Sequence, residues 1–297
     1  MSPGPEDVAR LDHAGVRNSF DRASGTYEAA AVLQARIADE LVERLEFFKF
    51  EPHAVLDLGA GTGRLTRELK RRYRRATVVA LDIAPGMLRE ARRNIGLFKR
   101  FERVCADVRR LPFADGSVDI AVSNVMLQWC DDLDTAFAEL RRVLKPDGFF
   151  SFTTFGPDTL RELRAAWAAA DDHSHVNTFI DMHDIGDALV RAGLTEPVLD
   201  VERVTLTYPD VLSLMRDLKT IGAHNVTAGR ARGLTGRARL RRMEAAYESA
   251  RRDNLIPATY EVVYGAAWGS AGKRASSVVS GEVRISPGAI RHHGPRE

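Results

Sequence analysis

The sequence predicts an α/β fold, a doubly wound sheet with a helical lid inserted before its last strand, on three observations. Apolar runs typical of buried strands alternate with amphipathic helical segments between residues 53 and 155, which is the pattern of a parallel sheet covered by helices on both faces. A glycine-rich turn joins the first of these strands to the next helix. Near the end of the chain, about forty residues of helical sequence separate two late strands, so these helices can cover one edge of the sheet.

The elements follow in a regular order along the first half of the chain. Apolar residues recur every three or four positions from Leu33 to Phe48, which predicts a helix before the glycine turn. Strands are predicted at 53–58, 76–82, 101–107, 117–124 and 149–155, with helices at 64–73, 85–94 and 133–144. Pro85 lies near the start of the second of these helices, where a missing backbone N–H is tolerated.

Beyond Pro157 the alternation changes. Helices are predicted at 158–170, 182–193, 211–221 and 237–252, with strands at 198–208 and 258–268. These elements predict one domain over residues 18–269 that contains a lid insertion at about 209–254. Residues 1–17 and 270–297 lack apolar periodicity, so both ends are predicted to be disordered.

Composition disfavours several classes of protein. The formal net charge is only +2 with 28% charged residues, so there is no global basic field to favour nucleic acid. Cys105 and Cys130 are too few for a disulfide framework, and the histidines lack zinc-ligand spacing, so no metal site is expected. The first residues lack the layout of a signal peptide, and no apolar run approaches the length of a membrane span. We therefore expect a cytoplasmic protein without membrane contact.

The turn after the first strand, in "VLDLGAGTGRLTREL", has the features of a ligand site. Gly59, Gly61 and Gly63 permit a tight turn and a close approach to a ligand at a helix N-terminus. Their spacing is G-x-G-x-G, whereas a dinucleotide site has G-x-G-x-x-G, and Asp57 precedes them at the strand end. A carboxylate there disfavours a pyrophosphate and favours a ligand with cationic groups, such as the sulfonium and ammonium of S-adenosylmethionine.

Two further carboxylates end the neighbouring strands. Asp82 ends the second strand, where a carboxylate can accept hydrogen bonds from both hydroxyls of an adenosine ribose. Asp107 ends the third strand and is expected to accept a hydrogen bond from the adenine amino group. A single acidic residue at a strand end is equally well explained as a helix cap or a solvated loop residue. Three of them at this spacing predict a nucleoside cofactor site.

The chain resembles the class I S-adenosylmethionine-dependent methyltransferases in "VLDLGAGTG", "ALDIAPGML", "CADVRRLPFADGSVDIAVSNVMLQW" and "LRRVLKPDGFFSFTTFG", which cover residues 55–156. It resembles more closely the malonyl-acyl-carrier-protein O-methyltransferases of the biotin pathway. That resemblance spans about residues 18–268 and includes "SFDRASGTYEAAAVLQ", "TTFGPDTLRELRAAW", "FIDMHDIGDALVRAGL", "LTYPDVLSLMRDLKTIGAHN" and "PATYEVVYGAAW".

The resemblance implies a Rossmann-like sheet of seven strands with the last strand antiparallel. It also implies S-adenosyl-L-methionine as cofactor and methylation of the free carboxylate of a malonyl thioester, carried by acyl carrier protein or coenzyme A, to start biotin synthesis. A complex I assembly factor keeps the same fold and is thought to hydroxylate an arginine, so an arginine hydroxylase or a non-catalytic assembly factor is the alternative. The segments "FGPDTLRELR" and "YPDVLSLMRDL" resemble both groups.

Methyl transfer to a carboxylate needs positioning more than acid–base chemistry. A malonyl carboxylate is already ionised at neutral pH, so no general base is required. What the site needs is a cation for that carboxylate, and Arg164 is the candidate because a guanidinium can hold a carboxylate in a bidentate fork. Arg161 is a weaker candidate, and a solvated helix arginine is the alternative for both.

Three further residues are candidates for contact with the ligands. The resemblance implies that the segment around Tyr27 folds over the cofactor, whereas the sequence alone is equally compatible with an aromatic residue at a helix start. Asn124 and Gln128 lie at the end of the fourth strand and are expected to contact the cofactor or the substrate. Trp129 is interpreted equally well as a core residue.

The lid contains a local excess of positive charge. Residues 229–252 contain eight arginines and two glutamates. Such a surface would steer an acidic carrier protein towards the site, with a solvated helix face or an RNA-binding patch as the alternatives. We expect a monomer, although the sequence leaves the oligomeric state open.

Overall fold

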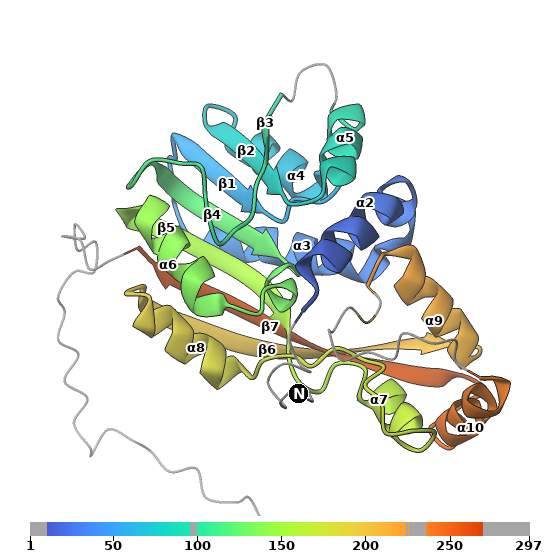
Figure 1. Ribbon diagram of the computed structural model, residues 1–297. Coiled ribbons are helices and arrows are strands. Elements are labelled where there is room, and N and C mark those ends of the chain that lie inside the picture. The colour runs from blue at the N-terminus through green and yellow to red at the C-terminus, as the bar shows by residue number, and fades with distance from the viewer. Residues whose placement is uncertain (1–10, 96–99, 224, 226–235, 270–297) are drawn as a thin grey trace, which may run out of the picture.

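The structure, a computed structural model, describes residues 11–95, 100–223, 225 and 236–269 (Figure 1). Its centre is a sheet of seven strands in the order β3-β2-β1-β4-β5-β7-β6. The strands are β1 (Ala54–Leu58), β2 (Thr77–Asp82), β3 (Glu102–Cys105), β4 (Val118–Asn124), β5 (Leu144–Phe155), β6 (Thr195–Tyr208) and β7 (Ile256–Trp268). All neighbouring pairs are parallel except those made by β7, which runs antiparallel to β5 and β6. The predicted seven-stranded sheet with an antiparallel last strand is confirmed.

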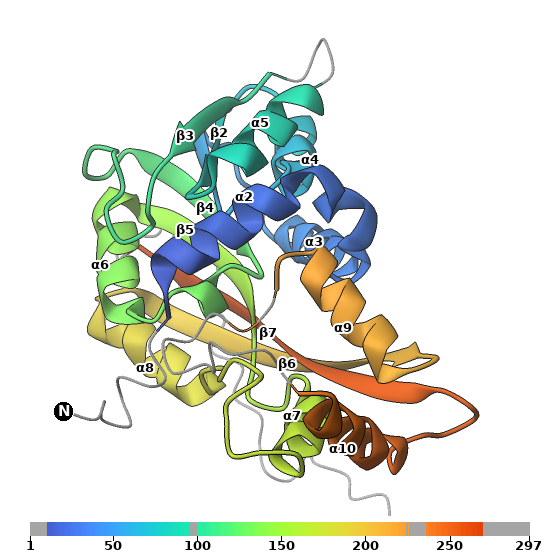
Figure 2. The same ribbon diagram turned by 45° about the vertical axis from the view of Figure 1, so that its right-hand side comes forward.

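Helices cover both faces of this sheet (Figures 1 and 2). They are α2 (His13–Ala30), α3 (Val32–Arg44), α4 (Arg64–Arg72), α5 (Pro85–Arg93), α6 (Leu133–Val143), α7 (Arg161–Ala168), α8 (Met182–Arg191), α9 (Val211–Thr220) and α10 (Arg237–Glu248). On one face, α3, α4 and α5 pack through a buried cluster that includes Leu41, Leu69 and Ala91. On the other face, α6 and α8 pack through Phe137 and Leu189. The core is thus divided between the two faces, as a doubly wound fold requires.

Several helices begin where a glycine, a proline or a capping residue in the sequence predicts. Gly63, with φ +80°, allows the chain to turn directly from the glycine loop into α4. Pro85 occupies the first turn of α5. Asp132 caps α6 by accepting a hydrogen bond from the Thr135 N–H at 2.9 Å. These caps fix the start of each helix close to a strand end, and therefore fix the loops that border the candidate site.

Several elements differ from the prediction. Helix α2 is absent from the predicted elements, and β3 ends at Cys105, so Asp107 lies in the loop after this strand. Strand β6 begins at Thr195 rather than at residue 198, and α7 and α10 are shorter than the predicted 158–170 and 237–252. Helix α2 begins at His13, before the expected domain start at residue 18, because Asp12 caps it by accepting a hydrogen bond from the Gly15 N–H at 2.9 Å. Strand β5 begins at Leu144 rather than at residue 149, since Leu144 pairs with Val118 before the register shifts. Residues 1–10 and 270–297, which were predicted to be disordered, lie outside the described part of the chain.

Helices α9 and α10 lie between β6 and β7, where the lid insertion is predicted. Together with α7 they form a third cluster beyond the carboxyl end of β5, in which Leu214, Met243 and Tyr247 are buried. The Tyr247 hydroxyl donates a hydrogen bond to the Pro257 carbonyl at 2.9 Å, which ties α10 to the start of β7. Both views show α9 beside the N-terminal helix α2 (Figures 1 and 2). Within the described residues, no helix has the length and apolar character needed to cross a membrane.

Candidate active site

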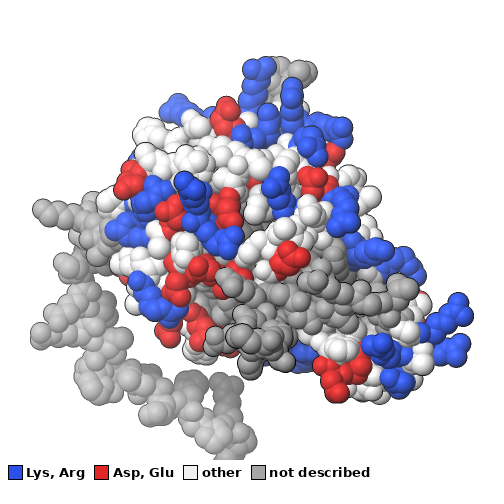
Figure 3. All heavy atoms as spheres, in the orientation of Figure 1, with Lys and Arg blue, Asp and Glu red and all other residues white. Residues whose placement is uncertain are grey.

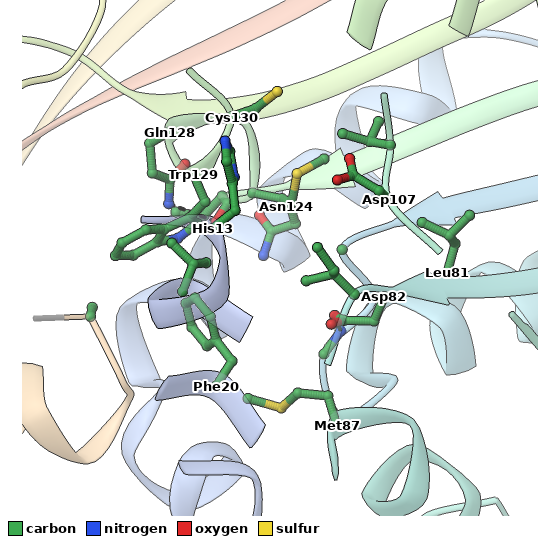
Figure 4. A pocket seen from close by; sticks show the side chains of 18 of the residues that line it. His13, Phe20, Leu81, Asp82, Met87, Asp107, Asn124, Gln128, Trp129 and Cys130 are labelled. Carbon is green, nitrogen blue, oxygen red and sulfur yellow. Dashed lines mark hydrogen bonds between the residues drawn. The ribbon is translucent and has the colours of Figure 1, made fainter. Parts of the chain in front are cut away.

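The first pocket lies at the carboxyl ends of β1, β2 and β4 and is covered by α2 (Figure 4). In Figure 4, His13, Phe20 and Trp129 form one side of this pocket, and Leu81, Asp82 and Asp107 form the other. Its space is about 990 Å³ with the open mouth included, which is the size of a typical cofactor pocket. Ligands of doubly wound sheets bind at this edge, where the strand order reverses between β1 and β4.

The glycine loop is folded tightly against the end of β2. Gly59 and Gly61 have φ of +73° and +54°, which is the left-handed region that favours glycine. A Cβ at Gly59 would lie 2.3 Å from the Met126 side chain, so only glycine fits there. A Cβ at Gly61 would have the Tyr27 ring as its nearest neighbour, at 3.9 Å, so Gly61 keeps backbone open to the pocket. The loop therefore forms the close cradle that its spacing predicts.

Asp82 is held rigidly at the pocket wall. Its Oδ1 accepts a hydrogen bond from the Ala84 N–H at 2.8 Å, and its Oδ2 accepts one from the Gly61 N–H at 2.9 Å. Burial raises the pKa of this carboxyl to about 6, although the backbone hydrogen bonds oppose the shift. Each oxygen keeps a further acceptor site, so the fixed carboxylate suits a vicinal diol such as that of ribose.

Asp57 lies deeper, at the wall of a smaller pocket that shares Gly59, Gly61, Tyr27 and Asn124 with the first. The side chain is only 1% exposed, and its Oδ2 accepts a hydrogen bond from the Thr66 hydroxyl at 2.5 Å. Burial, with a smaller contribution from the charge of Asp82, raises the pKa of Asp57 to about 7. Two nearby buried carboxylates favour a cationic ligand, because a positive charge would stabilise their ionised forms.

Asp107 also lines the pocket, but an arginine already pairs with it. The Arg109 Nη2 lies 2.7 Å from the Asp107 Oδ2 and holds the pKa of this carboxyl below its usual range. The His13 imidazole of α2 lies 2.7 Å from the Asp131 carboxylate and 3.0 Å from the Arg109 guanidinium. This group of side chains fastens α2 across the pocket. Sequence reasoning missed it, since His13 is far in the chain from Asp107, Arg109 and Asp131.

Asn124 and Gln128 line the pocket, yet their side chains are bonded within the protein. The Asn124 amide donates to the Gln34 carbonyl at 3.0 Å and accepts from the Thr153 hydroxyl at 2.8 Å. The Gln128 amide donates to the Val125 carbonyl at 2.6 Å and accepts from the Thr154 hydroxyl at 3.3 Å. They therefore hold α3 and β5 in place around the pocket.

The turn between Asn124 and Gln128 gives the pocket two further features. Val125 has φ +51°, a strained conformation for a β-branched residue that is found mainly at functional sites. Trp129 packs edge-on against Phe20, with ring centroids 5.1 Å apart, so it lines the pocket rather than the core. Val125 and the Trp129–Phe20 contact together shape the pocket wall opposite the glycine loop.

Tyr27 is half-buried and lines both the first pocket and the smaller one. Burial, with the negative charge of Asp82, raises the pKa of its phenol well above the usual range. The hydroxyl is therefore neutral at all physiological pH values and is available as a hydrogen-bond donor. The structure brings Tyr27 together with the glycine loop and Asp82, as the prediction of a covering segment requires.

A second pocket adjoins the first and extends under the lid. The two pockets share a wall made by Gln34, Gln128, Trp129, Phe155, Ile221 and Ala223. The far end of the second pocket contains His175, which stacks on Trp167 with centroids 3.7 Å apart and lies 2.8 Å from the Asp171 carboxylate. One compartment thus suits a nucleoside cofactor, and the other a second, largely apolar ligand that meets it at the shared wall.

The two predicted arginines are placed differently from the other candidates. Arg164 donates from its two terminal nitrogens to the Pro157 and Thr159 carbonyls, each at 2.9 Å, so it braces its own loop. Arg161 is exposed and lies near Asp158 and Glu162. Neither residue is part of the lining of the pockets described above. The structure therefore does not bring Arg164 into the lining of these pockets, because its terminal nitrogens hold backbone carbonyls of its own loop. Its Nε is buried and has no hydrogen-bond partner among the described residues.

Because the pKa of Asp57 is raised in the folded protein, we expect the free energy of unfolding to depend on pH. The carboxyl has a pKa near 3.8 in an unfolded chain and about 7 in the folded one, so the folded state binds the proton more tightly. The free energy of unfolding therefore falls as the pH rises through this window. Asp57→Asn removes the group that titrates, so its stability relative to the parent chain should rise by about 1.4 kcal/mol per pH unit from about pH 5 to pH 7. Urea unfolding of the ligand-free proteins at several pH values measures this slope; a difference that stays constant with pH would contradict it.

Comparisons with known proteins agree with this geometry. Residues 56–152 match the family model described as a methyltransferase domain. The chain is 56% identical over 268 residues to a malonyl-[acyl-carrier protein] O-methyltransferase of Methylovorus sp. (strain MP688), covering 88% of this chain and 90% of that protein. It is 50% identical to the protein of the same name from Halorhodospira halophila, over 98% and 99% of the two chains. Among solved structures, a putative methyltransferase of Bacillus halodurans shares the fold with a TM-score of 0.57 at 18% identity, covering 78% of this chain and 98% of that one.

Proposed function

The chain belongs to the malonyl-[acyl-carrier protein] O-methyltransferase family, and from that premise we propose how its own residues perform the reaction. It is an O-methyltransferase that esterifies the free carboxylate of a malonyl thioester. The observation that carries the proposal is the pair of adjoining pockets, one built for a nucleoside and one open towards the lid, in a chain 56% identical to a protein of that name.

S-adenosyl-L-methionine fits the donor set of the first pocket. In our proposal the Asp82 carboxylate accepts the ribose hydroxyls, and Asp107 accepts from the adenine amino group while Arg109 keeps it ionised. The glycine loop with Asp57 behind it faces the amino-acid part, whose ammonium suits the buried carboxylate. The chemistry that the bound cofactor supplies is a sulfonium methyl: a carboxylate oxygen forms the bond to that carbon while the carbon–sulfur bond breaks, and its electron pair stays on the sulfur.

The residues of this chain contribute position rather than proton transfer. A malonyl carboxylate is ionised at neutral pH, so no residue has to remove a proton. Holding the acceptor oxygen in line with the methyl carbon can contribute on the order of 7–11 kcal/mol to the barrier reduction. We assign Tyr27 a positioning role, since its neutral hydroxyl lies in the wall of the cofactor pocket. The Asn124 and Gln128 side chains keep that wall rigid through their internal hydrogen bonds.

We propose an acidic acyl carrier protein as the partner, because the relatives are named for it and the lid presents arginines. The ester product would then begin pimeloyl synthesis for biotin, and the enzyme would act as a cytoplasmic monomer. The arginine hydroxylase and assembly-factor alternative is not favoured, because the curated relatives at 46–56% identity carry the methyltransferase name.

The deciding experiment is incubation of the purified chain with methyl-labelled S-adenosylmethionine and malonyl carrier protein. We expect label to enter the carrier as a methyl ester that mild alkali removes, and acetyl carrier protein to remain unlabelled because it has no free carboxylate. Malonyl-coenzyme A serves as the second acceptor and reports whether the carrier is required. Saturable cofactor binding without transfer to either malonyl thioester would overturn the proposal and favour the alternative.

A further inference from the structure

The lining of the second pocket includes one lysine, Lys219, which forms no ion pair with the described residues. Lys219 lies near the end of α9, one helical turn after Met215, and both residues line this pocket together with Leu218. Residues four apart share one face of a helix, so this face of α9 is turned towards the pocket. The side chain of Lys219 is exposed, and no ion pair is formed between its ammonium and any described residue.

Three other basic side chains at or near the two pockets already have partners. Arg109 in the first pocket is bound to the Asp107 carboxylate. His175 in the second pocket lies against the Asp171 carboxylate. Arg164 lies outside the lining of both pockets, and its two terminal nitrogens donate to backbone carbonyls. Among the described residues that line the second pocket, Lys219 is the only lysine or arginine, so it is the residue available to bind an anion.

We infer that Lys219 holds the free carboxylate of the malonyl group beside the methyl donor and so selects a dicarboxylic acyl thioester. This inference rests on the proposed function. Ile221 and Ala223, which follow Lys219 closely in the chain, belong to the wall shared by the two pockets, so Lys219 lines the second pocket close to the place where cofactor and substrate would meet. The backbone bond from the Gly222 N–H to the Lys219 carbonyl, at 3.1 Å, fixes this short segment.

The surroundings of Lys219 suit a malonyl group on a long thioester arm. Phe155, Leu163 and Trp167 provide apolar walls for the methylene and the arm, and a low-dielectric wall strengthens an ion pair beside it. An ammonium is a compact charge that can bind one carboxylate oxygen and leave the other free to accept the methyl group. An acetyl thioester lacks this charge, so Lys219 would distinguish the two acyl groups before any chemistry occurs.

The test compares the binding of malonyl and acetyl carrier protein to the chain saturated with S-adenosylhomocysteine, which prevents turnover. We expect the parent chain to bind the malonyl form about ten- to hundredfold more tightly. Lys219→Met should remove most of this preference by weakening only the malonyl form, and Lys219→Arg should keep much of it. Arg216→Met, which removes an exposed cation from the same helix outside the pocket lining, is the matched control and should leave the preference intact. Cofactor affinity should be the same in all four proteins, which shows that each variant is folded.

Several results would overturn the inference. If the parent chain binds malonyl and acetyl carrier protein equally, no residue anchors the malonyl carboxylate. If Lys219→Met keeps the preference for the malonyl form, a residue other than Lys219 binds that carboxylate. Arg164→Lys is the competing variant: if it removes the preference while Lys219→Met does not, Arg164 holds the carboxylate. Methyl transfer by the parent chain is measured separately, so a failure of Lys219 as the anchor is distinguishable from a failure of the methyltransferase function.

Discussion

Replacing Asp82 with alanine is expected to weaken the binding of S-adenosylmethionine by about ten- to hundredfold. A hydrogen bond to a charged group contributes about 1.5–3 kcal/mol, and each 1.4 kcal/mol corresponds to a factor of ten in affinity. The effect should be large because the carboxylate is fixed from both sides before the ligand arrives, by the Ala84 and Gly61 N–H groups. Titration calorimetry with the folded variant gives the dissociation constant directly.

A matched control separates ligand contact from damage to the fold. Asp119 also accepts two backbone hydrogen bonds, from the His53 and Ala54 N–H groups at 3.0 and 2.9 Å, but it lies at the opposite end of β1 from the glycine loop. Asp119→Ala should therefore lower the thermal stability of the protein and leave the dissociation constant of the cofactor unchanged. If Asp82→Ala binds the cofactor as the parent chain does, the nucleoside lies elsewhere in the pocket.

The part of the site that follows strand ends could be predicted from the sequence. Parallel strands bring their carboxyl ends to one edge of the sheet, so residues that end successive strands must become neighbours. This rule places Asp57, Asp82 and Asp107 around the glycine loop, and the structure has all three at the walls of adjoining pockets. The alternation of apolar strands and amphipathic helices likewise determines the doubly wound sheet.

The rest of the site depends on contacts that no local pattern records. Whether Arg164 turns to a substrate or to the Pro157 and Thr159 carbonyls depends on the path of a loop, because a long side chain can reach either. The sequence gives no reason to single out Lys219, because only the folded structure shows that α9 lies beside the shared wall. The pairing of His13 with Asp131 joins segments separated by more than a hundred residues, and a single sequence gives no signal for it.

The described arginines of the lid differ in their contacts. Arg251 pairs with Glu248, and Arg252 donates to the Ser249 and Arg251 carbonyls. Arg239 lies 3.4 Å from the Asp171 carboxylate, and Arg242 donates to the Ala170 carbonyl at 2.8 Å, so both fasten α10 to the end of α7. Arg237 and Arg241 are exposed, lie four residues apart on α10 and form no ion pair with the described residues. Figure 3 shows Lys and Arg side chains at the lower right, where Figure 1 places α10. Arg230 and Arg232 lie outside the described residues.

Reversing the charges of Arg237 and Arg241 should slow the reaction with the carrier protein. We expect Arg237→Glu combined with Arg241→Glu to lower kcat/KM for malonyl carrier protein by about ten- to hundredfold at low salt, since charge complementarity acts mainly on the rate of encounter. Malonyl-coenzyme A, which needs no docking surface, should be affected much less. Arg241 paired with Arg242 would be a poorer choice, because Arg242 supports the fold.

A second charge reversal tests whether the position of the arginines matters. Arg74 and Arg75 are exposed in the loop that leads from α4 into β2, at the end of the sheet opposite the pockets, so Arg74→Glu with Arg75→Glu changes the net charge equally. This control should leave the ratio of the two kcat/KM values near that of the parent chain. Salt should reduce the parent's advantage with the carrier, because exposed charges are screened over about 8 Å at physiological ionic strength. If both double variants lower kcat/KM for the carrier equally, only net charge matters and α10 is not the docking surface. If neither variant lowers it, Arg237 and Arg241 form a solvated helix face and the carrier docks without them.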